Sequence, residues 1–179
     1  ETFTELTALA NGNYENCAFV NCKLADADLG GSNFIDCHFQ DCDLSNASLI
    51  ETGLKSVTFA KCKLLGLHFE DCANFLFAIT CTNCQLELAT FQHWKLPGTA
   101  FHECLLLEVD FTGADLEGST FRGCDLSRTI FHRTNLQKVD FSTAVNYRLA
   151  PEENRIRGAR FRRAGVEGLL AHYGIHLEE

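Results

Sequence analysis

The sequence has little of what most chains use for linkers, turns and membrane spans. It contains no methionine, one tryptophan and two prolines among 179 residues. No apolar run approaches the roughly 18 residues of a membrane span, and no basic segment with an apolar centre opens the chain. The sequence therefore predicts no membrane contact and no secretion. With its glycines scattered, it predicts a single domain over residues 1–179. Because methionine is absent, we expect the natural start to precede Glu1.

Positive charge is also scarce. The chain has 15 lysines and arginines against 24 aspartates and glutamates, which gives a net charge of −9. Binding to phosphate backbones requires basic side chains, so we expect no direct contact with nucleic acid. The acidity is concentrated at the amino-terminal end, because residues 1–54 contain nine acids and only one base, Lys23. Residues 147–179, in contrast, contain six arginines and five acids.

What the chain does contain is a five-residue repeat. From Tyr14 to Phe69 every fifth residue is large and apolar, and a small or medium-sized residue precedes most of them by two positions. The phase resumes two residues late, from Leu76 to Phe141, which predicts a two-residue insertion near Cys72–Phe75. A fixed short period is typical of a solenoid, in which each unit buries its apolar residues by stacking on its neighbours.

Residues twenty apart repeat one another, which indicates four five-residue sides per turn. Cys22, Cys42 and Cys62 are spaced by twenty, and Cys84, Cys104 and Cys124 continue the series once the insertion is counted. The large residues sort in the same way into columns of phenylalanine or leucine. We interpret eight of the ten cysteines as small inward residues and place Cys81 in a phenylalanine position. Free buried thiols favour a reducing, cytoplasmic location.

Several triplets resemble the unit of the pentapeptide-repeat family, Ala-(Asp/Asn)-Leu-X-X. They are Ala27-Asp28-Leu29, Ala47-Ser48-Leu49 and Ala114-Asp115-Leu116. The resemblance extends from about Leu9 to Val166. It implies an all-β fold, a right-handed quadrilateral β-helix of about seven coils, in which the large residue and the small residue two positions earlier point inward.

Two regions depart from the repeat. Trp94 occupies a small-residue position, and we expect a local bulge that turns its indole outward. The repeats cover about residues 9–146, and residues 147–179 are predicted to form a partial last coil and a helical cap. The partial coil is predicted from Ala159 with Phe161 and from Ala164 with Val166. The helix is predicted from the spacing of Val166, Leu169, Leu170 and Tyr173, with Gly174 ending it.

The residues favour a binding protein over an enzyme. Cys81 and Cys84 have the spacing of a metal half-site, but they fall on different sides of the repeat. His38, His68 and His93 are expected to face outward, and no nucleophile motif or phosphate-binding loop is present. We therefore predict no catalytic residue, no metal and no cofactor. Stoichiometric zinc in purified protein would favour the alternative of a metal protein.

A narrower resemblance concerns the carboxy-terminal end. Residues 168–175 are similar to the helical tail of the quinolone-resistance (Qnr-like) pentapeptide-repeat proteins. That resemblance implies a homodimer through the tail and an acidic rod that mimics DNA, binds DNA gyrase or topoisomerase IV, and confers fluoroquinolone resistance. The predicted dimer interface consists of Leu169, Leu170, Tyr173 and Ile175. The predicted partner-binding acids are Asp26, Asp28, Asp36, Asp41, Asp43 and Glu51.

The alternative is a structural or protein-interaction scaffold with another partner. The distribution of the outward acids separates the two hypotheses. A continuous acidic stripe favours DNA mimicry, whereas acids spread evenly around the rod favour a scaffold whose charges keep it in solution.

Overall fold

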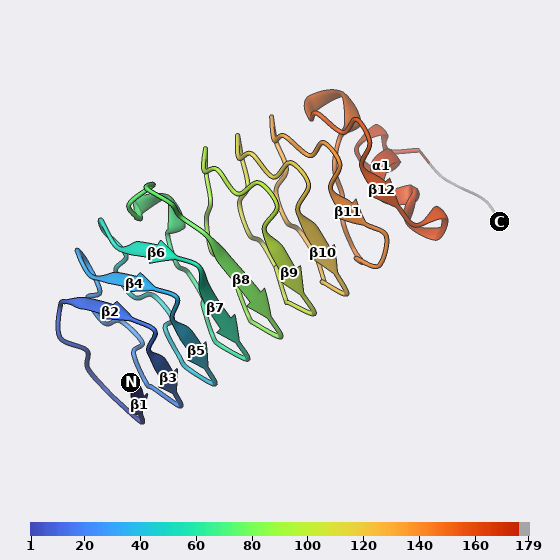
Figure 1. Ribbon diagram of the computed structural model, residues 1–179. Helices are drawn as coiled ribbons and strands as arrows, with labels where there is room; N and C mark the ends of the chain where they lie inside the picture. Colours follow the sequence, from blue (N-terminus) through green and yellow to red (C-terminus); the bar gives the residue numbers. More distant parts are fainter. Residues whose placement is uncertain (176–179) are drawn as a thin grey trace.

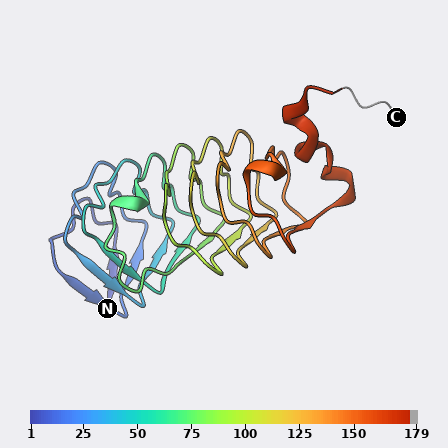
Figure 2. The ribbon, with the colours of Figure 1, turned by 90° about the horizontal axis from the view of Figure 1, so that it is seen from above.

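A computed structural model describes residues 1–175 and shows a parallel β-solenoid of about eight turns (Figures 1 and 2). Four separate ladders of parallel pairing run along the rod, so each turn has four sides. The predicted all-β solenoid is confirmed, and it is about one turn longer than the expected seven.

The first face is a nine-stranded parallel sheet in the order β1-β3-β5-β7-β8-β9-β10-β11-β12. Its register advances by sixteen residues from β1 to β3 and by twenty per turn after that, except that Phe59 of β7 pairs with Cys81 of β8, a step of twenty-two that confirms the insertion. The strands are β1 (Thr2–Thr4), β3 (Ala18–Val20), β5 (His38–Gln40), β7 (Val57–Ala60), β8 (Ile79–Thr82), β9 (Ala100–His102), β10 (Thr120–Arg122), β11 (Asp140–Phe141) and β12 (Arg160–Phe161).

The other three faces follow in chain order around each turn. The second face is a ladder of single bridges from Lys23 to Val145, and the third is a similar ladder from Asp28 to Ile130. The fourth face begins as a three-stranded sheet and continues as bridges to Arg155. The first and third faces therefore lie on opposite sides of the rod. The strands of the fourth face are β2 (Asn13–Glu15), β4 (Asn33–Ile35) and β6 (Gly53–Lys55).

The corners between faces depend on left-handed backbone conformations. Asp26 has a φ of 57° and Asn46 a φ of 56° at equivalent corners in successive turns. Aspartate, asparagine and glycine adopt this region most readily, which explains their frequency there. The corner backbone remains paired, because the Asp26 N–H donates to the Ser45 carbonyl at 2.8 Å.

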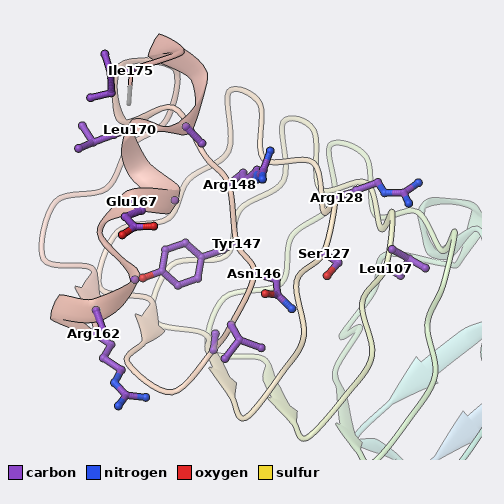
Figure 3. A pocket seen from close by; sticks show the side chains of 16 residues that line it. Leu107, Ser127, Arg128, Asn146, Tyr147, Arg148, Arg162, Glu167, Leu170 and Ile175 are labelled. Atoms are coloured by element: carbon purple, nitrogen blue, oxygen red, sulfur yellow. The ribbon is translucent and has the colours of Figure 1, made fainter. Parts of the chain in front are cut away.

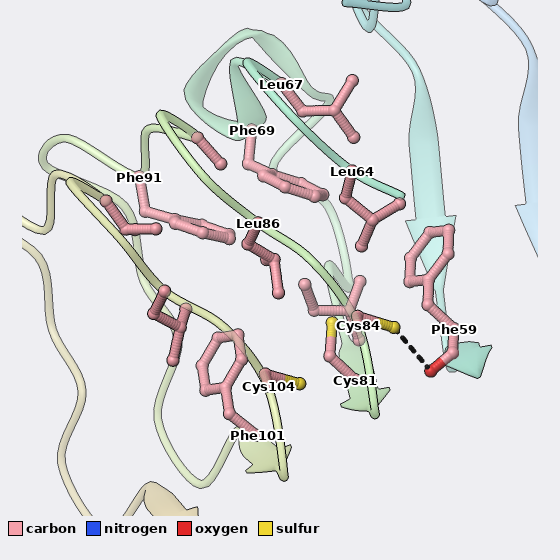
Figure 4. Close-up of a cluster of buried hydrophobic side chains, with 14 of the residues drawn as sticks. Phe59, Leu64, Leu67, Phe69, Cys81, Cys84, Leu86, Phe91, Phe101 and Cys104 are labelled. Atoms are coloured by element: carbon pink, nitrogen blue, oxygen red, sulfur yellow. Dashed lines mark hydrogen bonds between the residues drawn. The ribbon is translucent and has the colours of Figure 1, made fainter. Parts of the chain in front are cut away.

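The interior is filled by the predicted columns. Phe101 and Phe121 stack with ring centroids 5.2 Å apart and planes 4° apart, and Phe69 and Phe91 stack at 4.4 Å (Figure 4). Identical side chains one turn apart pack in the same orientation, which gives a close-packed core.

All ten cysteines are buried and none forms a disulfide. Cys81 takes a phenylalanine position between Phe59 and Phe101. The neighbouring inward position, small in most turns, is occupied there by buried Ile79. The two positions thus exchange volume, so the core stays filled where the phenylalanine stack is interrupted.

The insertion bulges from the fourth face after the short 3₁₀ helix η1 (Phe69–Asp71). We expected the inward column to resume at Leu76, and this was wrong: its side chain is 66% exposed, with a backbone φ of 57°. Phe77 instead packs against the core. Because of the two extra residues, Leu76 lies at a corner of the turn, and the Phe77 ring points inward in its place.

The predicted outward bulge at Trp94 was also wrong. Its indole is partly buried and packs perpendicular to the Phe77 ring at 5.4 Å. The indole Nε1 is shielded from solvent and has no hydrogen-bond partner. The sequence pattern could not reveal this contact, because Trp94 and the ring that receives it are seventeen positions apart in different turns.

The carboxy-terminal end is confirmed in part. Phe161 stacks on Phe141 at 5.2 Å, which extends the last coil as predicted, and Gly174, with a φ of 63°, ends the helical segment. Ala164 and Val166 belong to helical turns rather than to a coil, because the chain leaves the rod after β12. The helical elements are η2 (Pro151–Glu153), η3 (Arg163–Gly165), α1 (Glu167–Leu170) and η4 (Ala171–Tyr173).

Candidate protein-binding surfaces

The first face presents an uncharged surface over most of its length. Between Thr2 and Thr120 its outward positions include no aspartate, glutamate, lysine or arginine. Threonine and alanine dominate. The positions are Thr2, Thr4, Ala18, Val20, His38, Gln40, Thr58, Ala60, Thr80, Thr82, Ala100, His102 and Thr120.

The third face is acidic. From residue 26 to residue 113, its outward positions and its two adjoining corners contain seven acids and no lysine or arginine. We call this set the acidic stripe. It consists of Asp26, Asp28, Glu51, Glu70, Asp71, Glu108 and Asp110. Most are exposed or partly exposed on one side of the rod, so their fields add in one direction.

Two carboxylates between the corners of the third face, those of Asp28 and Asp110, accept short hydrogen bonds. Asp28 Oδ1 accepts from the Gly30 N–H at 2.9 Å, and Asp110 Oδ1 accepts from the Thr112 N–H at 2.7 Å. Such bonds two residues ahead stabilise the turn between bridges. In contrast, the side chains of the corner acids Asp26, Glu51 and Asp71 make no such bond. These corner acids are therefore available to a partner.

Most acids of the acidic stripe have no basic side chain close enough to neutralise them. Within residues 1–175, Glu108 pairs with Arg128 at 2.5 Å, and Glu70 lies 3.4 Å from His68. The other five carboxylates have no lysine or arginine partner in this part of the chain.

The six acids predicted from sequence do not lie on one surface. Asp26, Asp28 and Glu51 belong to the acidic stripe. Asp36 and Asp41 occupy the two corners that flank the first face. Asp43 lies on the second face, where its carboxylate is 3.9 Å from the Lys63 ammonium. The four further acids of the stripe could have been found by grouping outward residues twenty apart.

The second face changes character along the rod. Beyond its amino-terminal ion pair, it exposes Leu105 and Val145, at 46% and 49% of their surface. A groove of about 1190 Å³ separates this region from the helical segment, with Leu107 and Ser127 on its rod wall (Figure 3). Three arginines also line it: Arg128, Arg148 and Arg162.

The four residues predicted at the dimer interface lie in the helical segment. Leu169 packs against the core and Leu170 is partly buried. Tyr173 and Ile175 are exposed, at 58% and 52%. Leu170 and Ile175 also line the groove, on its helical side (Figure 3).

The buried thiols differ in the direction of their pKa shifts. Burial raises the pKa of the Cys37 and Cys72 thiols, which disfavours the reactive thiolate there. In contrast, hydrogen bonding with Cys62 lowers the pKa of Cys42 to about 7. His38, His68 and His93 face outward as predicted. Within residues 1–175, no group of three or more histidine, cysteine or acidic side chains could hold a metal ion. In the same residues, no helix has the length and apolarity to cross a membrane.

The filled interior and the distinct outer faces define a repeat solenoid, a class of proteins that binds partners along its surface. The sequence pattern described as "Pentapeptide repeat region" matches residues 13–77 and 68–141. The chain belongs to the pentapeptide-repeat family. No curated protein sequence matches it.

Among solved structures, the chain is similar to QnrB1, described as a plasmid-mediated fluoroquinolone resistance protein. One trypsin-treated form has a TM-score of 0.69 and 20% identity, covering 99% of this chain and 100% of that one. A second trypsin-treated form has a TM-score of 0.68 and 21% identity, covering 98% and 99%. Full-length QnrB1 has a TM-score of 0.54 and 21% identity, covering 98% and 100%. These likenesses concern the fold.

Proposed function

We propose that this protein is a non-enzymatic DNA mimic that binds a type II topoisomerase, DNA gyrase or topoisomerase IV, through its acidic stripe. In this proposal it acts in the cytoplasm as a homodimer joined at Leu169, Leu170, Tyr173 and Ile175, and it confers fluoroquinolone resistance. The observation that carries the proposal is the third face, which collects seven acids and no base from residue 26 to residue 113.

The charge density supports this proposal. Six of the seven acids have no lysine or arginine partner within residues 1–175. Over five turns of about 4.8 Å each, they give about one charge per 4 Å. That is close to the roughly 3.4 Å between phosphates along one strand of DNA. A basic surface built for a duplex would therefore meet a comparable line of negative charge, although with carboxylates in place of phosphates.

The rod shape and the likeness to QnrB1 add to this support. A straight rod can lie along a duplex-binding groove over several turns. The described function of QnrB1, fluoroquinolone resistance, makes gyrase and topoisomerase IV the first partners to test.

The test is gyrase supercoiling with purified protein, with and without a fluoroquinolone. One variant neutralises three corner acids of the stripe: Asp26→Asn, Glu51→Gln and Asp71→Asn. A matched control makes the same chemical changes at exposed corners outside the stripe: Asp36→Asn, Asp41→Asn and Glu103→Gln. We expect the stripe variant to lose roughly tenfold in potency, about 1.4 kcal/mol of binding, and the control to stay within about twofold.

Equal losses in both variants would contradict a stripe-specific contact and indicate a net-charge effect. No effect of the unmodified protein on either topoisomerase would contradict the proposal as a whole. The scaffold alternative would then lead, because the exposed Phe75 and Leu76 of the insertion offer an apolar contact to another partner. Affinity capture with a Phe75→Ser, Leu76→Ser control would identify that partner.

A further inference from the structure

The groove beside the helical segment is a second candidate binding site, separate from the acidic stripe. Its rod wall comes from the second face, with Leu107, Ser127 and Val145. Its other wall comes from the helical segment, including Gly168 and Leu170. Figure 3 shows the two walls facing each other across Tyr147 and Arg148.

The walls of the groove are fixed relative to each other. The Leu149 N–H donates to the Gly168 carbonyl at 3.1 Å. Gly165 and Gly168 lie so close to Tyr147 that a Cβ on either would collide with its hydroxyl or backbone oxygen. The groove is therefore a built feature of the last coil and its cap.

The lining is positively charged on a chain that is acidic as a whole. Within residues 1–175, three arginines and one carboxylate, that of Glu167, line the groove. Arg128 is engaged by Glu108, but Arg148 and Arg162 have no carboxylate partner within residues 1–175. Two available guanidinium groups favour a ligand with carboxylates.

The tyrosine at the back of the groove belongs to the packing between the last coil and its cap. Tyr147 is only 4% exposed, and its hydroxyl has almost no accessible surface and no hydrogen-bond partner in the described chain. The hydroxyl lies against Gly165 of the helical segment. A ligand in the groove therefore contacts the arginines and the apolar rod wall rather than this hydroxyl.

The apolar lining and the size indicate a peptide. Leu107 and Val145 expose 37% and 49% of their surface on the rod wall. The cavity, at about 1190 Å³, exceeds the roughly 300–1,000 Å³ of small-molecule pockets. Leu170 and Ile175 line the helical side of the groove, whereas the rod wall with Leu107 and Val145 contributes none of the four residues proposed for the dimer interface.

We propose that this groove binds an acidic, aliphatic peptide segment of a partner protein. Its aliphatic side chains lie against Leu107 and Val145, and its carboxylates pair with Arg148 and Arg162. The segment is an additional contact, independent of the acidic stripe.

The test is fluorescence anisotropy with a fluorescein-labelled peptide of alternating glutamate and leucine, and the same peptide with lysine for glutamate. We expect saturable binding of the glutamate peptide alone. The double variant Arg148→Glu, Arg162→Glu is expected to weaken it at least tenfold. The matched control Arg157→Glu, Arg163→Glu changes the same charge outside the groove and is expected to stay within twofold.

Tyr147→Phe tests whether the tyrosine acts only in packing. Because its hydroxyl has neither a partner in the described chain nor accessible surface, its removal should leave the Tm unchanged or raised and should change peptide binding by less than twofold. Equal binding of the lysine peptide, equal loss in the control, or no saturable binding would overturn the proposal. Dissociation of a dimer by the peptide in sedimentation would also overturn it, because the groove would then be the dimer interface.

Discussion

The first and third faces share one interior but present opposite surfaces. Phe101 and Phe121 stack under the first face at 5.2 Å, and Phe91 and Phe111 stack under the third at 5.1 Å. Outside, one face is uncharged threonine and alanine, and the other carries the acidic stripe. In this fold the inward residues therefore determine stability, and the outward residues can be selected for recognition.

The backbone of each face influences which outward residues it carries. The first face is a continuous sheet, where β-branched threonine fits the extended strand. The third face is a ladder of single bridges, where an aspartate such as Asp28 bonds to the N–H two residues ahead. The corner acids Asp26, Glu51 and Asp71 lack this local explanation, so the functional test uses them.

The largest expected effect tests whether the interior is equivalent under the two faces. Phe101→Ala and Phe111→Ala each remove a fully buried ring from a stack. We expect each to lower the free energy of unfolding by about 3–5 kcal/mol, measured by urea denaturation. A loss several-fold smaller under the third face would contradict the equivalence.

The exchange of side-chain volume between Cys81 and Ile79 occurs in the interior under the first face. Cys81→Phe adds a ring beside buried Ile79 and is expected to destabilise the protein by about 1–3 kcal/mol through overpacking. The double variant Cys81→Phe, Ile79→Ala makes room for the ring and is expected to recover most of the lost free energy of unfolding. If the single variant is as stable as the unmodified protein, the two positions do not compensate each other.

Added lysines test which face a partner contacts. Glu51→Lys with Asp71→Lys places positive charge in the acidic stripe, whereas Thr58→Lys with Thr80→Lys places it on the first face. In a gyrase binding assay we expect at least a tenfold loss, about 1.4 kcal/mol, from the first pair only. Stability is expected to change by less than about 0.5 kcal/mol in both, since these positions are at the surface. A comparable loss from the threonine pair would place the contact on the first face.

The smallest effect concerns the carboxylate where the first face ends. Hydrogen bonds from Ser142, with Arg160 nearby, hold the pKa of Asp140 below its ordinary value. A lowered folded-state pKa contributes stability above the unfolded pKa, and this is lost as pH falls through the folded value. Asp140→Asn is expected to lower the free energy of unfolding by less than about 1 kcal/mol near neutral pH. It should also reduce the loss of stability on acidification, which circular dichroism can follow. An unchanged loss of stability on acidification would contradict the coupling.

The sequence predicted the repeating part of the fold well because the interior follows a strict period. Columns such as Phe19, Phe39 and Phe59 could be read from spacing alone, and each is buried. The period failed at Leu76 and Trp94, where two turns adjust to each other. An extra ring from one turn fills space beside the indole of another, and local spacing contains no information about that contact.

The candidate sites divide in the same way. By itself, the sequence determined which residues point outward everywhere except around Leu76 and Trp94, because burial fixes every fifth position inward in the regular turns. The tertiary structure decided which outward residues share a surface: it separated Asp43 from the acidic stripe and added Asp71 and Asp110 to it. It also placed Arg148 and Arg162 around Tyr147, because the path of the chain after the last coil depends on close packing against two glycines.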